Sequence, residues 1–125
     1  MNLGDLVGSE LSGVSFLRGF VELHFDGPVL RSLAPPAVHR GGRVVRFGEP
    51  CSRDVLCSLI GLTVSQAEDL PDVLRVCFVD GAKLEITKAD RDVGAEVAHF
   101  IPMIDGRTDV APMWIWENVS PSPGD

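Results

Sequence analysis

The chain contains no tyrosine, only three cysteines and no apolar run long enough to cross a membrane as a helix. A membrane-spanning helix needs about 18 or more consecutive apolar residues, so the sequence predicts none. Residues 1–10 lack a basic segment followed by an apolar one, so we expect no secretory signal and a cytoplasmic location. Three cysteines in that setting predict reduced thiols rather than a disulfide framework.

Basic residues are scarce relative to acidic ones. The chain has 11 lysines and arginines against 18 aspartates and glutamates, a net charge of −7. Residues 51–125 carry 13 of these acids and only 6 of the bases. A negative field repels phosphate backbones, so we do not expect direct binding to nucleic acid. Such a surface suits solubility or docking onto a basic protein.

Motifs that carry chemistry are also missing. Neither a Gly-x-Ser-x-Gly elbow nor a glycine-rich phosphate loop occurs, and no close cysteine pair has the spacing of a zinc site. Cys51 precedes an expected helix, where a thiolate would be stabilised, but no partner for it can be identified. The sequence therefore predicts no enzyme activity, no metal and no cofactor.

Two similar hairpin patterns stand out among the segments that are present. Leu23–Leu30 and Val76–Leu84 each alternate apolar and polar residues, pass through Asp-Gly and return to a leucine. Asp-Gly between alternating hydrophobic residues is one of the strongest short-range hairpin signals. These segments predict two antiparallel hairpins.

The remaining chain reads as short strands separated by turns about every ten residues, which favours antiparallel β structure. We expect a loop over 34–42, one helix from Ser52 as N-cap to Gly61, and turns over 68–72 and 104–109. The predicted fold is an antiparallel β-sandwich or partly open barrel of about eight short strands with one short helix. It forms a single domain over 1–119 with a disordered tail over 120–125.

Two groups of residues are candidates for contacting a partner. Trp114 and Trp116 alternate, so in a strand both indoles lie on one face, either in the core or at an interface. Tryptophan is enriched in interface hot spots. The second group is acidic and is expected to lie in hydrated turns; it comprises Glu68, Asp69, Asp72, Asp90 and Asp92.

The order of these elements resembles small β-rich actinobacterial proteins of unassigned function, including immunity proteins of polymorphic toxin systems. The resemblance is carried by the first hairpin (20–33), the helix (52–62), the second hairpin (74–84) and the closing strand Trp-Ile-Trp-Glu-Asn (114–118). It implies a non-enzymatic binder that blocks a cognate toxin, and it transfers no site residues.

The leading hypothesis is a protein-binding module, most concretely an immunity-type inhibitor of a basic toxin. Its contacts would be the five acids, with Trp114 or Trp116 if exposed. One alternative is a small-molecule-binding barrel or minor enzyme, with His24, His99 or Cys51 at its mouth. A further alternative is an inhibitor whose acidic surface mimics nucleic acid. The oligomeric state cannot be read from the sequence.

Overall fold

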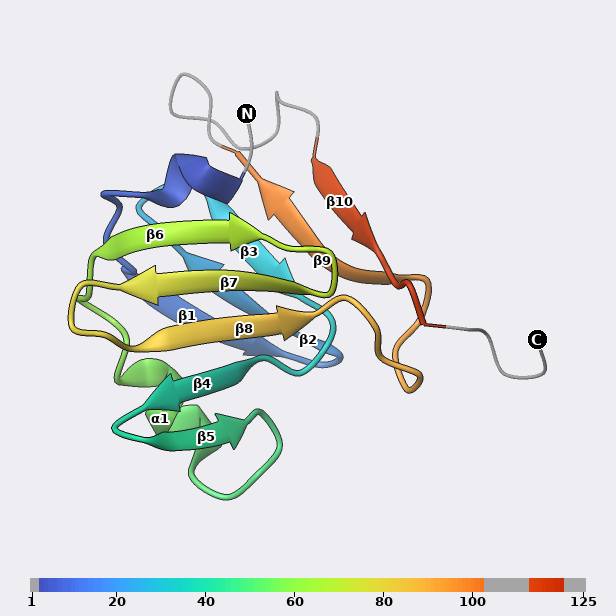
Figure 1. The fold of residues 1–125 in the computed structure, drawn as a ribbon, viewed down its shortest axis with the longest axis horizontal. Helices are drawn as coiled ribbons and strands as arrows, with labels where there is room; N and C mark the ends of the chain where they lie inside the picture. The colour runs from blue at the N-terminus through green and yellow to red at the C-terminus, as the bar shows by residue number, and fades with distance from the viewer. Residues whose placement is uncertain (1–2, 103–112, 121–125) are drawn as a thin grey trace.

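The two Asp-Gly hairpins form as predicted and belong to different sheets. In the computed structural model, which describes residues 3–102 and 113–120, Leu23 pairs with Leu30 and Val76 pairs with Leu84. Each hairpin lies within one of two five-stranded antiparallel sheets that pack face to face (Figure 1). The predicted β-sandwich is confirmed, with two open sheets and, in the described residues, ten strands in place of about eight.

The second sheet is built from five consecutive strands, and the strands of the first sheet come before and after them in the described chain. The first has the order β1-β2-β3-β9-β10 and the second the order β5-β4-β8-β7-β6. The strands are β1 (Gly13–Leu17), β2 (Phe20–His24), β3 (Val29–Ser32), β4 (Ala37–Arg40), β5 (Arg43–Arg46), β6 (Val64–Asp69), β7 (Val73–Phe78), β8 (Lys83–Thr87), β9 (Glu96–Ile101) and β10 (Trp114–Glu117). The 3-10 helix η1 (Leu3–Leu6) packs beside β6, and helix α1 (Ser52–Cys57) contacts β1 and β5.

The core lies between the sheets and follows from the period-two alternation of the strands. In β2 and β7 every second residue is buried, as the sequence predicts. Leucines from the helical segments also belong to the core. The fully buried side chains include Leu3, Leu6, Leu23, Leu30, Leu56, Leu59, Leu74, Leu84, Ile86 and Phe100.

The loop predicted over 34–42 is wrong, because Ala37–Arg40 form strand β4 between β5 and β8. The prolines that suggested a loop precede this strand. Gly41 and Gly42 follow it with φ angles of 58° and 77°, which suit a two-residue hairpin turn. A four-residue strand bounded by prolines and glycines carries too short an alternation to outweigh those signals. The β4–β5 hairpin is therefore one that the sequence reading missed.

The start of the helix also differs from the prediction. Cys51, not Ser52, occupies the N-cap position, and its side chain makes no capping hydrogen bond. Ser52 is buried instead, and its hydroxyl accepts a hydrogen bond from the backbone N–H of Gly48 at 3.1 Å. The α-helix ends at Cys57, earlier than predicted, and turns continue to Gly61. Cys57 and Ile60 are exposed.

Cys51 holds a left-handed backbone conformation, with φ at 68°. This region costs a residue with a Cβ atom about 1–2 kcal/mol and costs glycine little. We expect Cys51→Gly to raise the free energy of unfolding by about 0.5–1 kcal/mol in urea titrations. Cys51→Ala keeps the Cβ atom and should give no such gain. Equal stability of Cys51→Gly and Cys51→Ala would show that the left-handed conformation costs Cys51 no measurable free energy.

Two predictions fall outside the described residues. These are the turn over 104–109 and the disordered tail, of which only Ser120 is described.

Candidate functional site

Strand β10 is the last strand of the first sheet, and its two tryptophans lie on the side that faces the core. Trp114 pairs with Phe100 of β9, and Trp116 pairs with Ala98, while Ile115 stands opposite His99 on the other face. The two indole rings are 6.4 Å apart between centroids. The prediction that both rings share one face is confirmed.

The two rings nevertheless have different surroundings. Trp116 is only 7% exposed and belongs to the core cluster. Its indole N–H donates a hydrogen bond to Asp69 Oδ2 at 2.9 Å, which joins β10 to β6 of the opposite sheet. Trp114 is 47% exposed, and Met113 and Ile115 beside it are exposed as well. A partner contact requires an exposed side chain, and Trp114 meets this condition whereas Trp116 does not.

Asp69 is a carboxylate with partners on two other segments of the chain. Desolvation raises the pKa of Asp69, but hydrogen bonds from Lys88 and Trp116, together with the Lys88 charge, outweigh it and hold the pKa below its ordinary value. Lys88 Nζ forms an ion pair with Asp69 Oδ1. Asp69 is thus an ionised carboxylate with two partners of its own chain.

The prediction that Glu68 and Asp69 lie in a turn is wrong, because both residues lie at the end of strand β6. Glu68 faces Arg75 at 3.6 Å, and Arg75 also donates to Glu85 at 2.7 Å. The expected turn is limited to the residues after β6, where Asp72 is exposed and its backbone carbonyl accepts the N–H of Lys88 at 2.9 Å. A positive side chain therefore already lies beside each of the two β6 acids.

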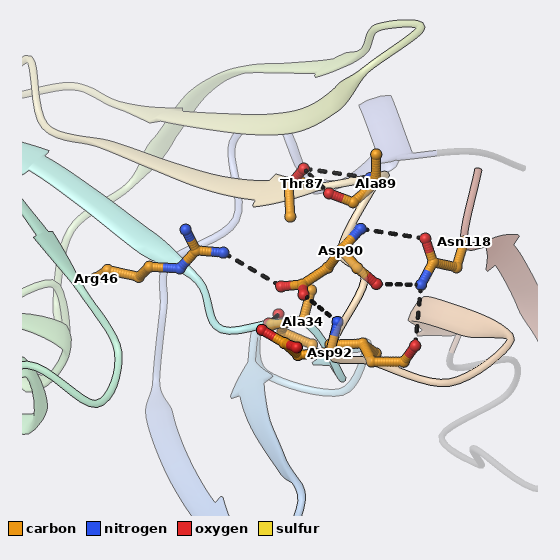
Figure 2. Close-up of polar contacts among 9 residues, drawn as sticks. Ala34, Arg46, Thr87, Ala89, Asp90, Asp92 and Asn118 are labelled. Carbon is orange, nitrogen blue, oxygen red and sulfur yellow. Dashed lines mark hydrogen bonds and ion pairs between the residues drawn. The ribbon is translucent and has the colours of Figure 1, made fainter. Parts of the chain in front are cut away.

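The β8–β9 loop contains Asp90 and Asp92 and folds around Asn118 (Figure 2). Asn118 Nδ2 donates to three backbone carbonyls, those of Asp90 at 2.6 Å, Val93 at 3.1 Å and Gly94 at 2.9 Å. Its Oδ1 accepts the N–H of Asp90 at 3.1 Å and that of Ser120 at 3.0 Å. Asn118 therefore fixes the loop to the chain that follows β10.

Asp90 is a structural residue in this loop rather than a hydrated surface acid. Its side chain is 9% exposed and faces Arg46 Nη2 of β5 at 3.2 Å. Its other oxygen accepts the backbone N–H of Asp92 at 3.0 Å, as Figure 2 shows. The carboxylate of Asp92 itself is exposed, and among residues 3–102 and 113–120 it has no cationic partner within ion-pair distance.

Lys88 connects these segments. Its carbonyl accepts the N–H of Val119, its N–H reaches Asp72, and its ammonium group reaches Asp69. The sequence reading missed Lys88 and Asn118, since a single lysine or asparagine outside a motif gives no signal of its role. The structure thus gathers the five predicted acids around one end of the sandwich, with Asp72 and Asp92 free of ion pairs among the described side chains.

The residues of the small-molecule alternative do not share one site. His24 Nε2 lies 2.9 Å from the hydroxyl of Ser15 on β1. His99 is buried on β9, with Nδ1 3.2 Å from Arg31 and Nε2 2.8 Å from Glu96. Because a guanidinium can only donate, Nδ1 of His99 accepts and Nε2 carries the proton. Cys51 lines cavities beside α1 that include neither histidine.

Comparisons of the chain with protein-family models, with curated proteins and with solved structures found no match. No helix in the described part of the chain is long and apolar enough to span a membrane. Within the same residues, no three His, Cys, Asp or Glu side chains are grouped so that they could hold a metal ion.

Proposed function

We propose that this chain is a protein-binding module and, most concretely, an immunity-type inhibitor that neutralises a basic toxin enzyme by direct binding. The observation that carries the proposal is the exposure of Trp114 on an edge strand, directly beside a tryptophan that is buried. A single exposed tryptophan flanked by Met113 and Ile115 is the kind of anchor that dominates interface energies.

The edge of β10 supplies a second means of recognition. Within the described chain, β10 pairs with β9 alone, so the backbone groups on its outer side are available to an added strand. Proteins commonly bind an extended partner segment by adding it to such an edge. Main-chain hydrogen bonds would then align the partner, and Trp114 would pack against its side chains.

The net charge of −7 favours a basic partner. Asp72 and Asp92 lie at the same end of the molecule as the C-terminal end of β10. Their charges would raise the encounter rate more than the final affinity. The pairing of Glu68, Asp69 and Asp90 with cations of the same chain does not favour the nucleic-acid mimic.

The test uses the full chain as bait in lysate of its native host, in wild-type and Trp114→Ala forms. We expect one basic protein to be enriched on the wild type, and the variant to bind it at least about 30-fold more weakly, as for an interface hot spot. The variant should stay folded and lose only about 1–2 kcal/mol of stability, because Trp114 is half-buried beside Trp116.

Val44→Ala is the matched control, since Val44 is an exposed apolar residue on the edge strand β5. It should leave capture unchanged. Expression of the captured protein alone should arrest growth, and co-expression of the wild-type chain should restore growth. Capture of no protein partner, or equal capture by the Trp114 variant, would refute the proposal.

A further inference from the structure

A cavity of about 440 Å³ lies between the β4–β5 hairpin and helix α1. Its apolar lining comes from Val38 and Val45 of the hairpin and Val55 of the helix, while the exposed residues around it include Arg43 and Cys51. The volume is in the range of small-molecule sites, which are mostly apolar with a few polar groups that fix the orientation of the ligand.

The arginines of the hairpin differ in how they are paired. Arg40 lines the cavity but is held by Asp80 at 2.9 Å and lies 3.4 Å from the carbonyl of Ser58. Arg46 faces Asp90. Arg43 also lines the cavity, and its guanidinium has no hydrogen-bond or ion-pair partner among the described residues. An unpaired guanidinium beside an apolar wall offers a bidentate site for a carboxylate.

We propose that this cavity binds a small organic carboxylate with an apolar body. The carboxylate pairs with Arg43, and the apolar body lies on the three valines. Asp54 on the same cavity disfavours ligands of higher negative charge, such as phosphate.

A strained residue lies at this cavity. Cys51, with its φ of 68°, lines the cavity between hairpin and helix as well as the smaller one beside it. Strained backbone conformations of this kind concentrate at ligand sites. The site lies away from β10 (Figure 1), so it is independent of the proposed protein-binding surface and its failure would leave that proposal intact.

Alkylation of the cysteines tests the site directly, because Cys51 is exposed beside it. Trypsin places Cys51, Cys57 and Cys77 in three separate peptides (47–53, 54–75 and 76–83), so iodoacetamide rates can be read for each thiol in one digest. The probe is hexanoate, with 1-hexanol as the uncharged control and inorganic phosphate as the control without an apolar body. We expect a Kd on the order of 1 mM for so small a ligand.

At about four times that concentration, alkylation of Cys51 should slow about fivefold, because only the free protein reacts. The rate at exposed Cys57, which lies outside the cavity, should not change. Hexanol and phosphate should protect far less. Arg43→Gln should weaken protection by hexanoate about tenfold or more, whereas Arg18→Gln, at an exposed arginine between β1 and β2, should not.

Three results would overturn the proposal. They are no protection of Cys51 by hexanoate, equal protection by hexanol or phosphate, and protection that survives Arg43→Gln. If Arg43→Gln fails to fold, Val45→Asp serves as the second variant, because it places a negative charge on the cavity wall and should also abolish protection.

Discussion

Replacing Asn118 with aspartate is expected to lower the free energy of unfolding by about 3 kcal/mol. The two side chains have the same shape, but aspartate puts an oxygen where Nδ2 now donates to the carbonyls of Asp90, Val93 and Gly94. The two N–H groups that these three carbonyls share are lost, and the carbonyls face a negative charge instead. Each lost partner in a part-buried site costs about 1 kcal/mol or more, so the effect is large for so small a change.

Urea titration measures this effect, and Gln66→Glu is the matched control. Gln66 is an exposed amide on β6, so its replacement makes the same change in net charge without breaking a network. The control should stay within about 0.5 kcal/mol of the wild type. An Asn118→Asp variant as stable as the control would show that the loop does not depend on this side chain.

Replacing Trp116 with alanine is expected to cost about 3–5 kcal/mol, the usual range for a large aromatic residue in a core. Trp116→Phe should cost less, because it retains most of the apolar contact and loses the hydrogen bond to Asp69. Trp114→Ala, on the same strand and the same face, should cost less than Trp116→Ala, because Trp114 is 47% exposed. Thermal and urea unfolding of the three variants gives the comparison.

The pH dependence of Trp116→Phe separates the hydrogen bond from the packing. The pKa of Asp69 is lowered in the folded state, so its ionised form contributes stability that is present above the unfolded pKa of about 3.9. That stability is lost as the pH falls through the lowered folded value. The stability difference between wild type and Trp116→Phe should therefore shrink on acidification into this range. A difference that is constant with pH would assign the whole cost to packing.

Local sequence patterns were sufficient for the hairpins but not for the strand between them. Leu23–Leu30 and Val76–Leu84 carry both alternation and an Asp-Gly turn, and both signals agree. In β4 the signals conflict, since prolines and glycines flank four residues that only their neighbours β5 and β8 stabilise as a strand. A strand that depends on long-range pairing leaves little trace in its own sequence.

The candidate surface shows the same limit. Alternation places Trp114 and Trp116 on one face, but their exposure depends on where the opposite sheet ends, which the pattern of one strand does not contain. The candidate acidic residues illustrate the same limit. Asp90 reads as a hydrated loop residue, yet its partner Arg46 lies 44 positions earlier and Asn118 lies 28 positions later. Such pairs become visible only when the fold is known.

The central claim is that Trp114 contacts a protein partner while Trp116 holds the two sheets together. Fluorine NMR of the chain labelled with 5-fluorotryptophan tests it most directly, because the chain has only two tryptophans and each gives one resonance. On titration with the captured basic protein, the account predicts that the Trp114 resonance shifts or broadens and that the Trp116 resonance stays in place. An unchanged Trp114 resonance at saturation would contradict it.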